Sequence, residues 1–164
     1  MNEIAFRAEP LEKDRADIRS LLGSSGFFRP REIEVAIELI DDRLAKGSAS
    51  EYLFLFAEAG DQIAGYVCYG PVTMTEGRFE LYWIAVDASR RGQGIGKLLL
   101  GRAEAHMREL GGKYAYSETS SRAIYRSTRE FYHKQGYREV AQVPFFYADD
   151  DDKVILMKTL QEGV

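Results

Sequence analysis

Cysteine and histidine are nearly absent from this 164-residue chain, which has one cysteine, Cys68, and two histidines, His106 and His133. A single cysteine excludes an internal disulfide and a cysteine-based zinc centre, and two scattered histidines give no sign of a metal site. Cys68 lies inside an apolar strand pattern with no base beside it in sequence, so we interpret it as a core residue rather than a nucleophile. We therefore expect a reducing, cytoplasmic setting and no metal cofactor.

Long apolar runs, repeats and low-complexity linkers are also missing. No apolar run is long enough to cross a bilayer, and residues 1–5 lack the basic and apolar regions of a signal peptide, so we expect neither export nor a membrane partner. The four prolines mark no boundary between domains. With 45% hydrophobic and 29% charged residues, the chain is long enough to bury a core, and we predict one domain over residues 1–164.

The chain lacks an excess of positive charge as well. Its 22 basic and 26 acidic residues give a net charge of -4, which argues against a nucleic-acid partner. The distribution is uneven, because residues 1–80 hold nine basic and fifteen acidic side chains, a net of -6, whereas residues 81–164 hold thirteen and eleven, a net of +2. The second half of the chain is therefore the basic half.

What the sequence does contain is a glycine-rich turn between a strand pattern and a helix pattern. Residues 90–96 read Arg-Arg-Gly-Gln-Gly-Ile-Gly and separate the apolar run 79–86 from the amphipathic stretch 97–110. In the first turn of a helix the backbone N–H groups have no intrahelical partner and carry the positive end of the macrodipole, and glycines let an anion approach closely. The turn therefore predicts a phosphate site.

Two common phosphate loops do not fit this turn. The loop of nucleotide hydrolases has Ser or Thr after its Gly-Lys pair, but Leu98 stands at that place here. A dinucleotide fingerprint needs glycine at its first, third and sixth positions, and counting from Gly92 the sixth is Lys97. What remains, the pattern Arg-x-x-Gly-x-Gly of residues 91–96, resembles the acyl-CoA pyrophosphate loop of the Gcn5-related N-acetyltransferase (GNAT) superfamily. The alternative is that the glycines only end a strand.

The segments on both sides strengthen the resemblance. Residues 80–86, Glu-Leu-Tyr-Trp-Ile-Ala-Val, look like the family's fourth strand, and residues 131–137, Phe-Tyr-His-Lys-Gln-Gly-Tyr, are similar to its Phe-Tyr-x-x-x-Gly-Phe signature. Outside residues 79–137 the resemblance rests on the order of the elements. It implies an α/β fold of the GNAT acyl-CoA N-acyltransferase type, an α+β arrangement with a central mixed twisted sheet of about seven strands flanked by about four helices.

Periodicity predicts these elements along the chain. Strands are expected over residues 4–8, 52–58, 63–69, 79–86, 113–117, 140–147 and 153–160, with a hairpin turn at Gly60-Asp61. Helices are expected over residues 14–22, from Pro30, over 94–110, and from a capping box at Ser127 and Glu130 to Gly136. The strand before the glycine-rich turn and the strand after its helix are expected to pair in parallel. The aspartates at 149–152 are expected in solvent, because four adjacent carboxylates repel one another.

The resemblance implies acetyl-CoA as co-substrate and indicates which residues bind it. Backbone groups of Ile84, Ala85 and Val86 are expected along the pantetheine arm, and amides from Arg91, Gly92, Gln93, Gly94, Ile95, Gly96 and Lys97 around the pyrophosphate. The family often has an asparagine seven residues before its signature tyrosine, and Tyr125, which stands there, is a further CoA-contact candidate. Residues 90–138 hold eleven basic and four acidic side chains, which suits a phosphate-bearing ligand, although solvated helix faces explain them equally well.

Glu80 is the candidate general base for deprotonating an amine. A carboxylate at the head of an apolar strand is out of place unless something uses or pairs it, and partial burial would raise its pKa toward the value that suits proton abstraction. It also matches the position of a glutamate base in some family members. The alternative is an ion pair at the end of a strand, and Glu118 is the reserve candidate for the base.

Tyr132 is the candidate general acid to the leaving thiolate, and it matches the family's tyrosine. A phenol has an ordinary pKa of about 10, above about 8.5 for a thiol, so it stays protonated at neutral pH. The alternative is core packing beside Phe131. An acceptor pocket is a further candidate role for the aromatic residues Tyr66, Tyr69, Phe145, Phe146 and Tyr147, although sheet packing explains most of them.

The sequence therefore predicts an N-acetyltransferase that moves acetyl from acetyl-CoA to a primary amine by direct attack, without a metal. The acidic first half and the aspartates at 149–152 favour a small cationic acceptor such as a polyamine or amino sugar, but a protein N-terminus or lysine would be attracted equally. A non-catalytic acyl-CoA-binding sensor is the alternative of another class, and the presence of both catalytic candidates argues against it. A homodimer is the commonest assembly for such a chain.

Overall fold

The computed structural model describes residues 3–161 and contains the predicted mixture of strands and helices. Four α-helices are formed there, α1 (Asp14–Ser24), α2 (Pro30–Lys46), α3 (Ile95–Glu109) and α4 (Arg126–Lys134). The seven strands are β1 (Ile4–Arg7), β2 (Leu53–Ala59), β3 (Gln62–Pro71), β4 (Arg78–Val86), β5 (Tyr114–Ser120), β6 (Arg138–Ala148) and β7 (Asp151–Thr159). They follow the sheet order β1-β2-β3-β4-β5-β7-β6. The α+β class and the seven-stranded mixed sheet are confirmed.

Two compact units divide the described residues. The first runs to Gly70 and includes Trp83–Ala103, and the second comprises Pro71–Tyr82 and the residues from Glu104 onward. The strand β4 and the helix α3 each contribute residues to both units. The glycine-rich turn therefore belongs to the first unit, and Glu80 and Tyr132 belong to the second.

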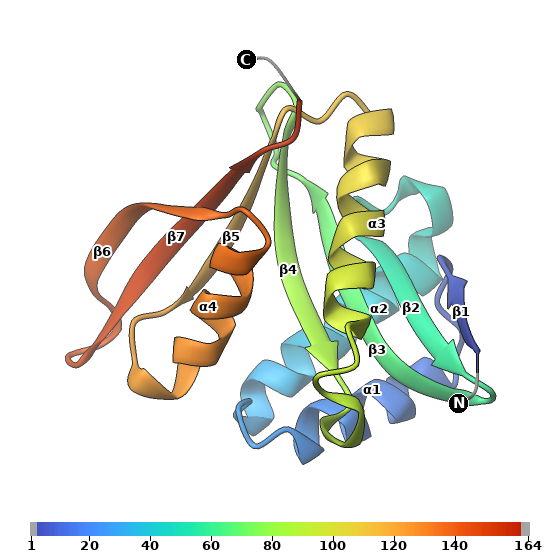
Figure 1. Ribbon diagram of the computed structural model, residues 1–164. Coiled ribbons are helices and arrows are strands. Elements are labelled where there is room, and N and C mark those ends of the chain that lie inside the picture. The colour runs from blue at the N-terminus through green and yellow to red at the C-terminus, as the bar shows by residue number, and fades with distance from the viewer. Residues whose placement is uncertain (1–2, 162–164) are drawn as a thin grey trace. The chain divides into compact units, whose positions relative to one another are not determined.

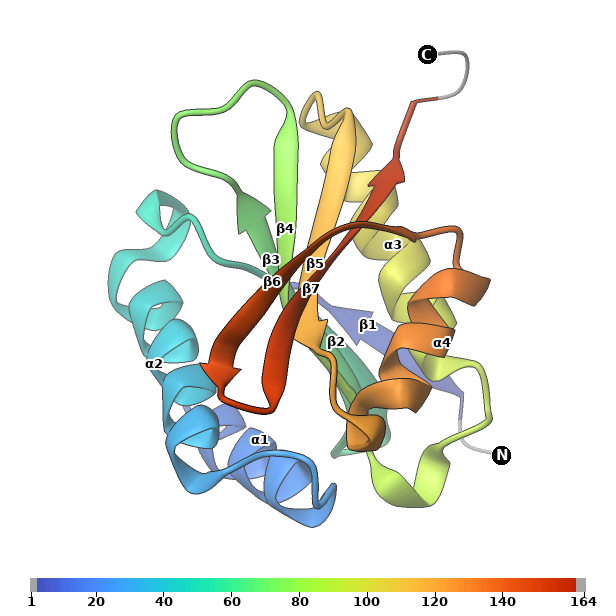
Figure 2. The same cartoon turned by 90° about the vertical axis from the view of Figure 1, so that its left-hand side faces the viewer.

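The first unit is built on the antiparallel strands β1, β2 and β3, with Ile4 opposite Ala59 and Leu53 opposite Tyr69. Figure 2 shows α1 and α2 on one side of these strands and the first part of α3 on the other. The apolar stripe of α2 points into this core, since Ile33, Ile37 and Ile40 are all buried. Burying both faces of the strands explains why nearly every residue of β3 is buried.

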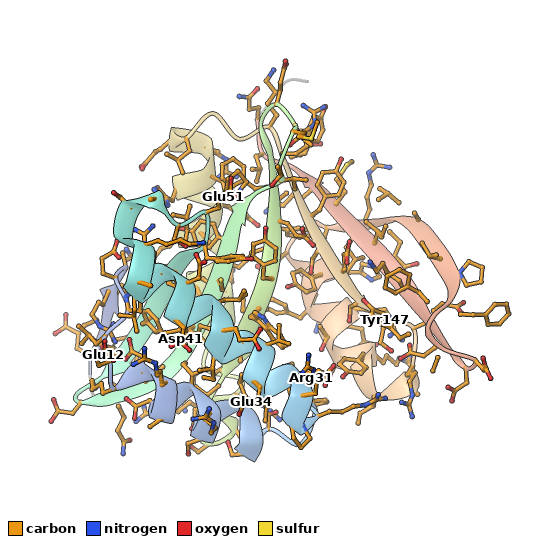
Figure 3. All side chains as sticks on the ribbon, turned by 180° about the vertical axis from the view of Figure 1, so that it is seen from behind. Glu12, Arg31, Glu34, Asp41, Glu51 and Tyr147 are labelled. Carbon is orange, nitrogen blue, oxygen red and sulfur yellow. The ribbon has the colours of Figure 1, made fainter. Side chains whose placement is uncertain are left out.

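Ion pairs lie on the outer side of α1 and α2. Arg19 contacts Glu34 at 3.1 Å, and Arg15 binds both Asp41 and Glu12. The three acidic partners are labelled in Figure 3. Such solvent-exposed pairs each contribute only about 0–1 kcal/mol to the free energy of unfolding. We therefore interpret this surface as a solvated helix face rather than a binding site.

The second unit is centred on β5. Arg78–Leu81 of β4 pair in parallel with Tyr114–Ser117 of β5, as predicted, and β5 pairs antiparallel with β7, which pairs with β6. Helix α4 covers one side of these strands (Figure 1). The parallel ladder between β4 and β5 ends at Leu81 and Ser117.

Helix α3 ends in a Schellman motif at Gly111 and Gly112. The Gly112 N–H donates to Met107 O at 2.7 Å, and the Gly111 N–H donates to Arg108 O at 3.0 Å. Gly111 has φ +84°, which glycine adopts without strain. A Cβ at position 112 would lie 2.6 Å from Met107 O, so a larger residue there would displace the backbone that leads into β5.

Two details of the second unit differ from expectation. The predicted capping box at Ser127 is wrong, because a 3₁₀ turn over Ala123–Tyr125 runs directly into α4 at Arg126, and Glu130 accepts from Arg126 Nε at 3.1 Å instead. The aspartate run is not wholly in solvent either. Asp151 is 4% exposed and accepts from the Ser120 hydroxyl, since β7 begins inside the run rather than after it.

Tyr66 of β3 carries a buried hydroxyl with no hydrogen-bond partner among the described residues. Tyr66→Phe should therefore leave the free energy of unfolding unchanged or raise it by up to about 2 kcal/mol, because it removes a polar atom that folding desolvates without compensation. Urea denaturation measures this. Tyr137→Phe is the matched control, since its hydroxyl donates to Glu104 at 3.1 Å, and it should lose about 1–2 kcal/mol. A comparable loss in Tyr66→Phe would contradict the assignment.

Candidate active site

The glycine-rich turn of the first unit has the geometry of an anion site. Gly92 and Gly94 have φ +78° and +80°, and a Cβ built at either would meet no atom within 4 Å. The first helical hydrogen bond runs from Leu98 N–H to Gly94 O at 3.1 Å, so the preceding N–H groups of α3 are the ones that a helix start leaves without intrahelical partners. Residues 91–94 of the turn are exposed to solvent. An anion can therefore approach the backbone here without moving a side chain.

Side chains near the turn are held by contacts of their own. The Arg91 guanidinium lies 5.2 Å from the centre of the Phe27 ring, and Phe28 packs edge-on against Trp83 at 5.3 Å. Asp87, which precedes the turn, accepts from Ser89 N–H at 2.9 Å, and this hydrogen bonding lowers the pKa of its carboxyl. These contacts hold the segment that leads into the turn.

The end of β4, where a pantetheine arm is expected, packs closely on β3 in the first unit. Asp87 N–H donates to Ala64 O at 2.8 Å. A Cβ at Gly65 would lie 2.9 Å from Ala85 O and 3.1 Å from Leu99 Cδ1. Glycine at 65 thus lets the β4 backbone and α3 approach β3, which positions Ile84, Ala85 and Val86.

In the second unit Tyr132 is buried, with 3% of its surface exposed, and lies between two aromatic rings. Phe131 and Tyr137 contact it edge-on, with ring centres at 5.5 and 5.2 Å. Burial raises the pKa of the Tyr132 phenol to about 12, and a hydrogen bond with Ser117 opposes that rise. This raised pKa keeps the Tyr132 phenol protonated at neutral pH.

Glu80 lies half-buried on β4. Burial raises the pKa of its carboxyl, the nearby Glu118 carboxylate raises it further, and the Lys153 ammonium lowers it. Glu118 itself accepts from Lys153 Nζ in a salt bridge of 2.7 Å. Both sequence candidates for the base thus lie in one cluster, and of the two Glu118 is the one that is ion-paired.

The two catalytic candidates lie on opposite faces of the second unit's strands. Glu80 is opposite Tyr116, and Leu81 is opposite Ser117, so alternation directs Glu80 to one side and the Ser117 partner of Tyr132 to the other. We name the first side the carboxylate face, defined by Glu80, Tyr116, Glu118 and Lys153. The opposite side is covered by α4. Both candidates lie at the end of the β4–β5 ladder.

Comparison with known proteins identifies the chain. Residues 16–137 match the sequence model of the Acetyltransferase (GNAT) family. The chain belongs to this family. Members of the GNAT family are acetyl-CoA-dependent N-acetyltransferases, which is the class of enzyme that the glycine-rich turn and the signature around Tyr132 indicated.

Similar proteins support the GNAT assignment at two levels. A GNAT-family protein from Desulfovibrio desulfuricans, solved by crystallography, is 41% identical with a TM-score of 0.95, and the match covers 97% of this chain and 100% of that chain. The yncA protein of Salmonella typhimurium, solved with its cofactor acetyl-CoA, is 19% identical with a TM-score of 0.73 over 99% of this chain and 97% of that one. The second likeness shows the fold alone.

A curated relative, the uncharacterized N-acetyltransferase MJ1530 of Methanocaldococcus jannaschii, is 29% identical over 105 residues, or 64% of this chain. The match covers 65% of that relative, a little under two thirds of its length.

None of the helices within residues 3–161 combines the length and apolar character of a membrane span, and in the same range no three metal-ligating side chains come together.

The remaining sequence candidates fall in different places in this GNAT fold. Cys68 is buried in β3, where burial raises the pKa of its thiol, as its interpretation as a core residue requires. Tyr125 is the residue that precedes α4. The aromatic group divides, since Tyr66 and Tyr69 are in the core, whereas Phe145, Phe146 and Tyr147 are 46–71% exposed on β6.

Two partners of the candidate residues were not predicted from the sequence. Ser117 is hydrogen-bonded to Tyr132, and Lys153 forms a salt bridge with Glu118. The residues of each pair are far apart in sequence and meet only because of the strand registers and the packing of α4. Part of this arrangement could have been predicted from the sequence, because side-chain alternation along β5 places Ser117 and Glu118 on opposite faces.

Proposed function

We propose that this protein acetylates the primary amine of a small cationic molecule, using acetyl-CoA, by direct attack of the amine on the thioester. One observation carries the proposal. A group that can accept a proton, Glu80, and a group that can donate one, Tyr132, lie on opposite faces of the strands at the end of the β4–β5 ladder. Direct transfer uses two such groups, because the attacking amine loses a proton and the departing thiolate needs a donor.

The glycine-rich turn fits the anionic part of acetyl-CoA. Its glycines at positive φ, its open Cβ positions and the first-turn N–H groups of α3 match what a pyrophosphate requires of a backbone site. Exposed basic side chains at Arg91 and Lys97 add favourable charge. We assign the pyrophosphate to residues 91–97 and the pantetheine arm to the backbone of residues 84–86.

Tyr132 acts mainly as a hydrogen-bond donor. Its pKa of about 12 keeps the phenol protonated at neutral pH. Complete transfer of its proton to a thiolate whose conjugate thiol has an ordinary pKa of about 8.5 is uphill by about 5 kcal/mol. The phenol therefore stabilises the charge that develops on sulfur, and water supplies the proton that the free thiol finally carries.

Glu80 accepts the proton from the acceptor ammonium, either directly or through a water molecule. Its raised pKa brings the carboxylate closer to the amine in basicity than an exposed glutamate would be. The carboxylate face also supplies the negative charge that attracts a cation. A small amine reaches a half-buried carboxylate more readily than a side chain on a folded protein does.

Gly94→Val tests the assignment of the turn. A β-branched residue is strained at φ +80°, and relief of about 2 kcal/mol of strain would move the turn out of its binding conformation. We expect acetyl-CoA affinity, measured by calorimetry, to fall at least about 30-fold. Gly101→Val is the matched control, because Gly101 is exposed in α3 with no atom within 4 Å of its Cβ, and it should bind normally. Equal affinity in both variants would refute the assignment.

The acceptor class is tested with purified protein and a panel of amines. We expect kcat/KM for small primary amines that carry one positive charge to exceed that for peptides with a free N-terminus or lysine by at least about tenfold. Release of CoA thiol measures the rate for every acceptor in the same way. A higher kcat/KM for the peptides would replace the small-molecule acceptor with a protein acceptor.

A further inference from the structure

The carboxylate face holds a cation of its own, Lys153. Its Nζ lies 2.7 Å from Glu118 Oε2 and 3.7 Å from the centre of the Phe146 ring, and its side chain is only 14% exposed. The register places Lys153 opposite Ser120, on the side of β5 that carries Glu118. Contacts from two neighbouring strands therefore hold the ammonium in one place, so that its charge acts at a fixed position rather than being averaged over many rotamers.

The shape of β6 accounts for the position of Phe146. Val143 pairs with Lys153 and Ala148 with Asp151, so residues 144–147 of β6 lie opposite Asp152 alone. In this bulge Phe145 has φ +56°, which is rare for an aromatic residue, and its N–H donates to Asp152 Oδ1 at 2.8 Å. The extra residues bring Phe146 back over Lys153, while Tyr147, labelled in Figure 3, stays 46% exposed.

We propose that Lys153 is a positioning and specificity-determining residue, which neutralises Glu118 and leaves Glu80 as the carboxylate that meets the acceptor amine. This inference rests on the proposed function. With Lys153 in place, the three charges of Glu80, Glu118 and Lys153 sum to -1, which matches an acceptor with one ammonium group. Without Lys153 the sum is -2, which matches a dication.

The remaining ionisable groups do not duplicate this role. Alternation and register put several of them on the carboxylate face of the second unit, namely Arg78 and Tyr82 of β4, Tyr114 and Tyr116 of β5, Arg138 of β6, and Asp151 of β7. Arg78 lies over the Tyr114 ring at 4.8 Å, and Asp151 is bonded to Ser120. The pKa of Glu80 is raised by Glu118 and lowered by Lys153, after the larger effect of burial.

The first test is a carbon-detected NMR titration of the Glu80 carboxyl in the full-length protein, with the signal assigned by its loss in Glu80→Gln. We expect the titration midpoint to move to higher pH in Lys153→Met, because the repulsion from Glu118 is no longer screened, and to lower pH in Glu118→Gln. Lys153→Arg keeps the charge and should keep the midpoint. Lys134→Met, which removes an exposed lysine of α4, is the matched control and should also keep it.

The second test is activity. In Lys153→Met the acid limb of kcat/KM should shift to higher pH, with a loss of at least about threefold below the wild-type midpoint, the equivalent of about half a pH unit. The KM of a linear diamine should fall at least about threefold relative to that of a monoamine of the same length. A uniform loss of activity at every pH, with no change in amine preference, would show a merely structural role and overturn the proposal.

The two tests separate this inference from the proposed function. An unchanged Glu80 midpoint in Lys153→Met overturns the role of Lys153, whatever the activity. If the wild-type protein acetylates no amine, the proposed function fails, while the titration still decides whether Lys153 sets the charge state of Glu80. Near-ultraviolet circular dichroism of each variant confirms that the fold is retained.

Discussion

We expect Tyr132→Phe to lower kcat for acetyl transfer by about 100- to 1,000-fold and to leave acetyl-CoA affinity within about threefold of wild type, because in the proposed mechanism it removes the donor to the leaving thiolate. The ring and its edge-on contacts with Phe131 and Tyr137 remain in place. Stopped-flow detection of released CoA at saturating amine gives kcat, and calorimetry gives the affinity. The loss should be smaller for acyl donors whose thiol has a lower pKa, since their thiolates need less stabilisation.

A buried phenol also contributes to stability, so the control must remove a similar group. Tyr137→Phe deletes the hydroxyl of the neighbouring ring, which donates to Glu104 at 3.1 Å. It should lose stability comparable to Tyr132→Phe and keep a kcat close to wild type. If Tyr132→Phe turned over as fast as Tyr137→Phe, Tyr132 would be a packing residue and the leaving group would need another donor.

If Glu80 is the general base, as proposed, Glu80→Gln should lower kcat at saturating amine by about 100- to 1,000-fold. The pH profile gives a second signature. Burial and Glu118 raise the pKa of Glu80, and the base must be ionised to act, so wild-type activity should fall as pH drops through a midpoint above the ordinary range of glutamate. In Glu80→Gln this acid limb should be absent.

The matched control for Glu80→Gln is Glu130→Gln, which removes an exposed carboxylate of α4 that pairs with Arg126. It should change neither kcat nor the pH profile. Unchanged turnover in Glu80→Gln would contradict the role of Glu80. A residual acid limb that vanished only in Glu118→Gln would transfer the role of base to Glu118.

The parts of the site that depend on local sequence were predictable. The turn before the helix start at Ile95 contains glycines that adopt positive φ, which few other residues do. The end of α3 is marked by Gly111 for the same reason. Helix α2 begins at Pro30, where a missing N–H costs nothing. These signals act within a few residues, so no knowledge of the tertiary structure is needed to read them.

Contacts between distant segments were not predictable. The bond between Tyr132 and Ser117 needs α4 to pack on β5, and the salt bridge between Lys153 and Glu118 needs the register of β5 against β7. The failed capping box has a similar cause, because a 3₁₀ turn that continues into α4 replaces the side-chain cap that Ser127 could have provided. Local sequence shows that Ser127 is able to cap a helix, but the packing of the surrounding chain determines where the helix begins.

The most direct measurement of the central claim is to incubate the protein with acetyl-CoA labelled in its acetyl group and a cell extract, and to locate the label by mass spectrometry. The account predicts label on the nitrogen of a small primary amine, at a rate that falls about 100-fold or more when Tyr132→Phe replaces the wild-type protein. Tight acetyl-CoA binding without any enzyme-dependent label would contradict it and identify the chain as a binding module.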